Sequence, residues 1–401
     1  MIAAPAPRGR GGGTVMLSLI WQPDFSATTN PTDPDYRRAT DLLASRDGTE
    51  LQRFPRPRGF VAPGETLVAT LGAWVGRQGG RPLTLMVHGG AFDPRDGATD
   101  SDDPFQRIYA PPSPTNPARL SWLPIVGLCD EAGRPGPGTA IAFGWLSRGA
   151  LRHWAGAGWN NPYLFPAFDL APLAAQALAA VIAALQQTGA PFSILAHGLG
   201  TRVVSQAIGY LRDAPRPWPA GGLRRILLLA GSEYGVDANR TLLGPGLGFE
   251  VVNLVNRSDA VLGWLVGDGS HPVRWNRSDA ARVIGFHGLK RAPGWLDLQL
   301  DRAEVQDWIE THLGLRVTGR APPGDKALHR LAGMNHWIGS MDEGNRALLR
   351  RLLDLDQPGL PWFEANAIPH FDGGRFDPTI PPTPMTIAAR QAQWQSEPIL
   401  G

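Results

Sequence analysis

The chain has 401 residues, of which 43% are hydrophobic and 18% charged, so it can bury a substantial core and is not disordered throughout. Thirty-eight Lys and Arg residues against 36 Asp and Glu residues leave a net charge of +2, which argues against a nucleic-acid partner. The single cysteine, Cys129, excludes an internal disulfide framework and a cysteine-based zinc site. The 49 glycines and 38 prolines predict many turns and long loops.

The beginning of the chain, residues 1–60, is rich in Pro and Arg and contains one strand candidate, Val15–Trp21. Its first residues lack the apolar segment of a secretory signal. The longest apolar run, Leu170–Leu185, contains Pro172 and is shorter than the roughly 20 residues that cross a bilayer. We therefore expect a cytoplasmic protein with no membrane span, in which this run forms a buried helix.

Strand-like and helix-like runs alternate through residues 61–355, which we expect to form one α/β domain. The strand-like runs are Thr66–Val75, Leu83–Val87, Ala140–Trp145, Phe192–Ala196, Arg225–Ala230, Phe249–Val255 and Val283–Phe286. The helix-like runs are Leu170–Gln187, Gly200–Leu211, Arg302–Leu313 and Glu343–Leu355. Short apolar strands separated by helices predict a mostly parallel central sheet flanked by helices.

Two further segments interrupt or follow this alternation. Residues 91–139 form a Pro-rich insertion, which we expect to cover one end of the sheet as a lid. The acidic run Asp100–Asp103 within it is interpreted as a solvated face, with metal binding disfavoured. Residues 356–401 form a Pro-rich tail, which we expect to wrap the surface.

The most informative stretch leads from the apolar run Phe192–Ala196 through a tight turn into a helix. Small residues at Ala196, Gly198 and Gly200 are what such a turn requires, because the strand and helix backbones approach closely there. The pattern resembles the nucleophile elbow of the α/β-hydrolase superfamily, in which a small residue, the nucleophile and a glycine alternate. At the nucleophile position this chain has Gly198 in place of Ser, Cys or Asp.

Neighbouring segments extend the resemblance over roughly residues 65–355. The run Leu83–Val87 ends in His88-Gly89-Gly90, and the resemblance implies an oxyanion hole formed by the N–H groups of Gly90 and Leu199. The run Ala142–Gly149, which includes Trp145 and Ser147, is similar to a strand end in a bacterial branch of the superfamily of unassigned function, although Leu146 replaces a proline. We expect five residues to line the site: His88, Gly89, Trp145, Ser147 and His197.

The resemblance also implies an acid and a base. Asp259 ends a strand-like run, and His336 lies in a loop before a helix, so the order of nucleophile position, acid and histidine agrees with the superfamily. Asp259 is alternatively a helix N-cap, and His336 alternatively faces solvent. Three other acids follow strand-like runs and compete for the role of the acid: Glu233, Asp237 and Asp279.

Since Gly198 cannot attack a substrate, the ordinary esterase mechanism is excluded for the chain as given. We expect an esterase-like site that either hydrolyses a small ester-like or apolar ligand with non-covalent help from His336 and Asp259, or has degenerated. Alternatives are a non-catalytic binding or scaffold module, and an inactivated variant of a serine esterase. Nucleotide binding is a weaker alternative, because Val203 replaces the third glycine of the Gly-x-Gly-x-x-Gly pattern that begins at Gly198. No cofactor or metal is expected.

Overall fold

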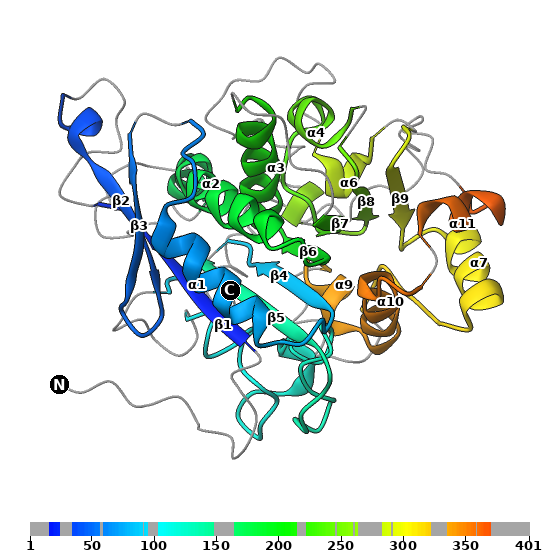
Figure 1. Ribbon diagram of the computed structural model, residues 1–401. Helices are drawn as coiled ribbons and strands as arrows, with labels where there is room; N and C mark the ends of the chain where they lie inside the picture. Colours follow the sequence, from blue (N-terminus) through cyan, green and yellow to red (C-terminus); the bar gives the residue numbers. More distant parts are fainter. Residues whose placement is uncertain are drawn as a thin grey trace.

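The structure is a computed structural model that describes residues 16–24, 34–56, 59–90, 92–94, 103–147, 164–214, 222–244, 247–259, 261–263, 283–289, 292–321, 335–357 and 359–369. Within these ranges, nine strands form one sheet in the order β3-β2-β1-β5-β4-β6-β7-β8-β9 (Figure 1). Their bounds are β1 Met16–Gln22, β2 Thr40–Ser45, β3 Glu50–Pro55, β4 Leu83–Val87, β5 Thr139–Trp145, β6 Phe192–His197, β7 Leu223–Leu229, β8 Glu250–Val255 and β9 Trp295–Gln299. Only β2 runs antiparallel to its neighbours, β1 and β3, and the other pairs are parallel.

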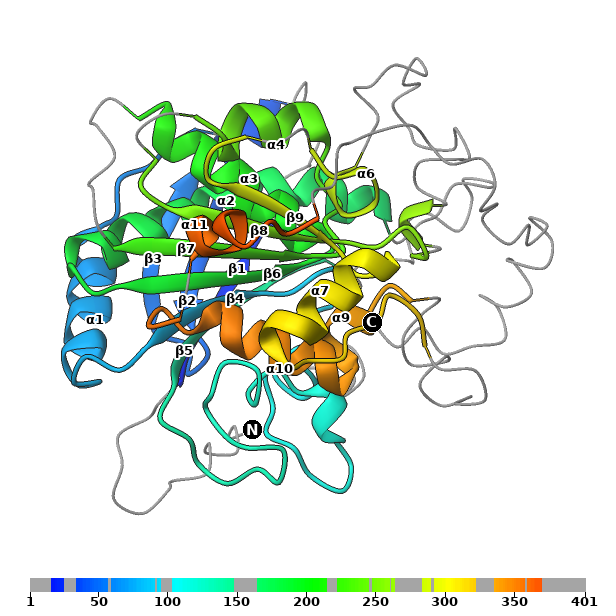
Figure 2. The ribbon, with the colours of Figure 1, turned by 90° about the vertical axis from the view of Figure 1, so that its right-hand side faces the viewer.

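Helices and loops cover both faces of the sheet (Figure 2). One face carries α1 (Glu65–Gly76), α2 (Leu164–Gln187), α3 (Leu199–Arg212), α4 (Gly235–Leu242) and α6 (Ile284–His287). The other carries residues 103–129, α7 (Ala303–Leu313), α9 (Ile338–Met341), α10 (Glu343–Leu353) and α11 (Leu360–Ala365). Short 3₁₀ turns occur at Pro34–Arg38 and Ala118–Leu120. The expected α/β arrangement, a mostly parallel sheet with flanking helices, is confirmed.

Two hydrophobic cores form, one on each face of the sheet, because the side chains of a strand point alternately to the two faces. In β4, Leu83, Leu85 and Val87 pack into the core under α1–α3, whereas Met86 packs into the opposite core. Successive residues of a strand point to opposite faces, so a strand between two helical layers must be apolar at nearly every position. All five residues of β4 are accordingly buried.

Helix α2 is the main core helix of the first face. It packs against α1 and α3, and its apolar, Ala-rich surface is buried almost all round. The window Leu170–Gln187 is apolar and long enough to cross a membrane, but 94% of it is buried inside the molecule. The expectation of a buried helix here is confirmed, and the helix begins earlier than predicted, at Leu164.

Most predicted strands and helices are present, but two strand predictions are wrong. Residues Thr66–Val75 lie in α1, whose buried residues Leu67, Leu71 and Trp74 follow the helical period instead of alternating. Residues Val283–Phe286 contribute one bridge at Val283 and then the single helical turn α6. The Gly285 N–H donates to the Gly231 carbonyl at 2.9 Å, which ties this helical turn to the segment after β7.

Strands β2, β3 and β9 were not predicted. The hairpin of β2 and β3 turns at Asp47-Gly48, where Gly48 has a φ of +92°, and the Asp-Gly pair is a hairpin signal that the sequence offered. The charged residues Asp41 and Asp297 interrupt the apolar pattern of β2 and β9, although both are buried. The strand candidate in residues 1–60 is confirmed as β1, which joins the central sheet beside β5.

The insertion and the tail are described in part. Residues 103–129 bury a large apolar surface that includes Tyr109, Trp122 and Ile125. The solvated-face interpretation is wrong for Asp103, which is buried and pairs with Arg46 at 2.9 Å, and the rest of that acidic run lies outside the described residues. The tail begins with α11, and residues 370–401 lie outside the described part.

Candidate active site

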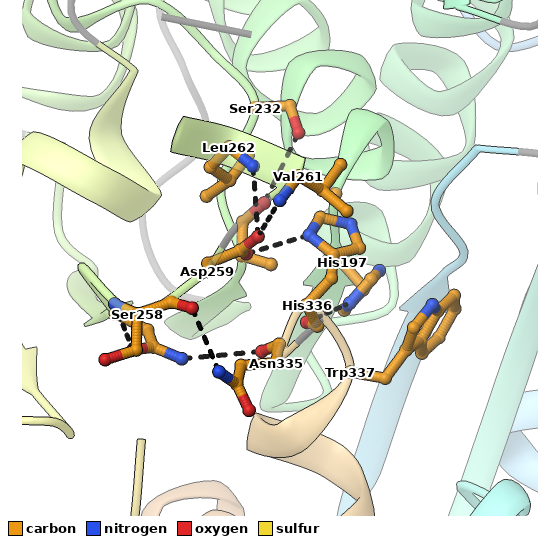
Figure 3. Close-up of polar contacts among 12 residues, drawn as sticks. His197, Ser232, Ser258, Asp259, Val261, Leu262, Asn335, His336 and Trp337 are labelled. Carbon is orange, nitrogen blue, oxygen red and sulfur yellow. Dashed lines mark hydrogen bonds and ion pairs between the residues drawn. The ribbon is translucent and has the colours of Figure 1, made fainter. Parts of the chain in front are cut away.

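The order in which strands are added to the sheet reverses at β4. Strand β5 adds to one side of β4 and β6 to the other, so the loops after β4 and β6 diverge at the carboxyl ends of these strands. In open α/β sheets, ligands bind outside the carboxyl ends of the strands at such a switch point. The residues at this edge therefore define a candidate active site, and Figure 3 shows a close-up of its polar contacts.

Gly198 forms the sharp turn between β6 and α3. Its backbone has φ 51° and ψ −126°, a conformation that L side chains rarely adopt. The main chain of Gly198 is held by two hydrogen bonds: its N–H donates to the Leu229 carbonyl at 2.9 Å, and its carbonyl accepts from the Thr201 side-chain hydroxyl at 2.7 Å. The predicted tight turn is present, and its geometry does not depend on a side chain at position 198.

Asp259 and His336, which are 77 residues apart in sequence, are in direct contact. The Nδ1–H of His336 donates to Asp259 Oδ2 at 2.8 Å (Figure 3). The other carboxylate oxygen of Asp259 accepts the N–H groups of Val261 at 2.9 Å and Leu262 at 3.0 Å. The N-cap interpretation of Asp259 and the acid interpretation therefore describe the two oxygens of one carboxylate.

The bond to Asp259 determines the tautomer of His336. Because the carboxylate accepts from Nδ1–H, the neutral ring carries its free lone pair on Nε2. A Cβ atom built on Gly198 would lie 3.4 Å from this Nε2. The structure thus brings the three predicted positions together, with the basic nitrogen facing the place where a nucleophile would stand.

The expected oxyanion donors flank the same place. The Gly90 nitrogen lies 4.0 Å from the Cβ position of Gly198, and Leu199 is the first residue of α3, where helical N–H groups have no acceptor within the helix. Within the described part of the chain, neither N–H meets a hydrogen-bond acceptor.

His88, directly after β4, is fully buried and is hydrogen-bonded within the loop that carries Gly89 and Gly90. Its Nε2 accepts the Trp145 N–H at 3.0 Å, and its Nδ1–H donates to Gly89 O at 3.0 Å. Burial lowers the pKa of His88 to about 3, so the ring is neutral. Trp145 and Ser147 are also fully buried and lie behind the site, where the Ser147 hydroxyl accepts the Phe92 N–H at 2.9 Å.

His197 packs beneath the base. Its ring stacks on Trp337 with centroids 3.9 Å apart, and its Nε2–H donates to the His336 carbonyl at 3.3 Å. Burial, reinforced by the neighbouring His336, lowers the pKa of His197 well below its usual range, so this ring is also neutral. Trp122 of the insertion packs edge-on against His197 with centroids 6.3 Å apart, and a Cβ at Gly89 would lie 2.8 Å from His197 Nδ1.

The competing acids lie elsewhere. Glu233 is buried and accepts from Arg202 at 2.6 Å, and Asp237 lies in the first turn of α4, near Arg240. Asp279 is outside the described residues. Four residues around the pair were not predicted as site residues: Trp122, Asn256, Asn335 and Trp337. A signal existed for Asn335 and Trp337, which are the sequence neighbours of His336.

Among the residues that the structure describes, no group of three or more His, Cys, Asp or Glu side chains is arranged to hold a metal ion. Comparison with protein-family models, with curated proteins and with solved structures finds no match. The interpretation of the site therefore depends on its own geometry.

Proposed function

We propose that this chain is an α/β-hydrolase-fold protein with an esterase-like site that uses water in place of the missing serine. The substrate would be a small ester-like or apolar molecule. The observation that carries the proposal is the line of Asp259, His336 and the empty Cβ position of Gly198, with distances of 2.8 Å and 3.4 Å.

In the proposed reaction, His336 Nε2 removes a proton from a water molecule as its oxygen attacks the ester carbonyl carbon. The N–H groups of Gly90 and Leu199 stabilise the negative charge on the carbonyl oxygen, and Asp259 stabilises the imidazolium. The tetrahedral intermediate then releases the alkoxide, which takes the proton from His336. No acyl-enzyme forms, since Gly198 offers no atom to acylate.

This chemistry is expected to be slow. Removing the triad serine of a protease costs about 10⁶-fold in turnover and leaves about 10³–10⁴-fold over water. The packing of Trp122 against His197 supports a covering role for the insertion, and we propose that residues 91–139 act as the lid of the site.

A non-catalytic binding module is the second candidate. It is favoured by the low exposure of the His336 side chain, 13%, which restricts the approach of water. Such a module would be stabilised thermally by its ligand without turnover.

Hydrolysis of short p-nitrophenyl esters separates the two candidates. The catalytic proposal expects slow steady-state release with no burst, abolished in His336→Gln and reduced at least about tenfold in Asp259→Asn. A burst of one equivalent would show that a covalent step occurs and that the water mechanism is wrong. Equal rates for the parent and His336→Gln would eliminate catalysis and leave the binding module.

A further inference from the structure

Two asparagines connect the loop that carries the acid to the loop that carries the base. Asn335, directly before His336, donates from Nδ2 to the carbonyl of Ser258 at 3.0 Å, and Ser258 directly precedes Asp259. In return, Nδ2 of Asn256, directly after β8, donates to the carbonyl of Asn335 at 3.4 Å. The two amides thus bridge the loops in opposite directions.

The backbone of Asn335 adopts a conformation that few residues tolerate. Its φ is +72°, in the left-handed region, where asparagine is enriched among residues other than glycine. Its side-chain Oδ1 accepts the Ala321 N–H at 2.9 Å, so both ends of the amide are engaged. Asn335 therefore determines both the direction of the chain that enters His336 and its distance from the acid loop.

Asn256 shapes the acid loop itself. Its Oδ1 accepts the Ser258 N–H at 2.9 Å, and its carbonyl accepts the Asp259 N–H at 3.3 Å. Its Nδ2 also donates to Gly319 O at 2.8 Å, which ties the loop to the segment that Asn335 contacts through Ala321. The acid and the base are thus held by one connected set of hydrogen bonds.

We propose that Asn335, with Asn256, is a positioning residue for the Asp259–His336 pair. The inference rests on the proposed function, since Asn335 acts only through that pair. Neither asparagine is among the atoms nearest the Gly198 position, so neither is a catalytic residue. Displacement of a catalytic group by about 1 Å can cost about 100-fold in rate, so such a clamp has a measurable effect.

The test uses two variants at position 335 and one control. Asn335→Asp keeps the acceptor for Ala321 but places an oxygen against the Ser258 carbonyl. Asn335→Gly keeps access to positive φ and removes both side-chain bonds. The control is Asn366→Asp, because Asn366 also donates its amide to a backbone carbonyl, that of Trp362 at 2.8 Å, but lies beyond α11.

The readout is the tautomer of His336, obtained from the ¹⁵N chemical shifts of its ring. The His336 signals are identified as those that are missing from the spectrum of His336→Gln. The parent and Asn366→Asp should show the Nδ1–H form, and both Asn335 variants should shift toward the Nε2–H form. On the ester assay we expect kcat to fall at least about tenfold with little change in KM, as for a group that acts only in the transition state.

The outcomes separate the two proposals. If folded Asn335→Gly keeps the parent tautomer, the positioning role is wrong, whatever the hydrolysis rates. If the tautomer responds to Asn335 while the parent shows no hydrolysis, the positioning of the pair stands and the catalytic proposal fails. Should Asn335→Asp not fold, Asn335→Gly carries the test alone.

Discussion

Gly200 lies directly against the backbone of His88. A Cβ atom built on Gly200 would stand 2.4 Å from the His88 carbonyl oxygen and 2.6 Å from that of Val87. Helix α3 therefore crosses the end of β4 at a distance that only glycine permits. This contact places Leu199 and Gly90, the two proposed oxyanion donors, on either side of the same site.

Gly200→Ala should destabilise the protein by about 3 kcal/mol, because the added methyl meets backbone that must move. Denaturant unfolding measures this loss. The matched control is Gly72→Ala in α1, where a Cβ meets nothing within 4 Å, and alanine there should stabilise by about 0.5–1 kcal/mol. Equal effects of the two substitutions would contradict the close approach of α3 and β4.

Gly198→Ser should raise hydrolysis of p-nitrophenyl esters at least about 100-fold and introduce a burst, because its hydroxyl would stand within reach of His336 Nε2. The substitution should also lower stability by about 1–3 kcal/mol, since serine must adopt the strained backbone of the turn. Gly198→Ala is the control, with the same strain and no nucleophile. If the serine variant shows neither burst nor rate increase, or if His336→Gln does not remove the gain, the site assignment fails.

Asp297 should make stability depend on pH. It is buried on β9, and burial raises its pKa to about 7, although Asn253 Nδ2 and the Leu289 N–H each donate to it at 2.7 Å. Between about pH 4 and 7 the unfolded chain has an ionised Asp297 and the folded chain a protonated one, so folding takes up a proton and stability falls as pH rises. The cost is complete above about pH 7, at up to about 4 kcal/mol.

Asp297→Asn removes this titration, so its free energy of unfolding relative to the parent should increase as pH rises from about 4 to 8. Denaturant melts of both proteins at several pH values give this difference directly, and they cancel the contributions of the buried histidines. A difference that is constant with pH would show that Asp297 titrates at its ordinary value in the folded protein.

Arg56 and Asp41 form a buried ion pair at 2.6 Å, with both side chains fully inaccessible. Arg56→Met should cost about 3–5 kcal/mol, because it leaves a buried carboxylate without its partner. Adding Asp41→Leu should recover most of the loss, as a double-mutant cycle would measure. The His336 tautomer should be unchanged in each variant that folds, which makes the pair a stability control remote from the site.

Strands with strong apolar patterns were predictable. Those from β4 to β8 were found because, lying between two helical layers, they are apolar on both faces. Strand β9 was missed because Asp297 interrupts its apolar pattern, and the hydrogen bonds that stabilise the buried carboxyl come from Asn253 of β8 and from Leu289, which a local pattern does not reveal. Helix α1 was mistaken for a strand because leucine, valine and tryptophan suit both structures, and its Leu67–Leu71 spacing was overlooked.

The site was predictable where motif and chain order coincide. The glycines around position 198 and the histidine before α9 could be recognised from the few residues on either side of them. The structure brings both together with Asp259. The supporting roles of Trp145 and Ser147 were not readable, because burial depends on neighbours distant in sequence. The bridge from Asn335 to Ser258 spans 77 residues, and no local pattern specifies such a contact.

The hydrogen bonds that hold the main chain at position 198 have a practical consequence. Because Leu229 and Thr201 hold the bend, the fold does not depend on which side chain stands at position 198. A side chain there adds only backbone strain. Measurements of compactness or secondary structure would therefore not distinguish a chain with a nucleophile at this position from one without, and melting would report only the backbone strain of about 1–3 kcal/mol. Telling an active chain from an inactive one requires the identity of the residue at position 198 or an assay of turnover.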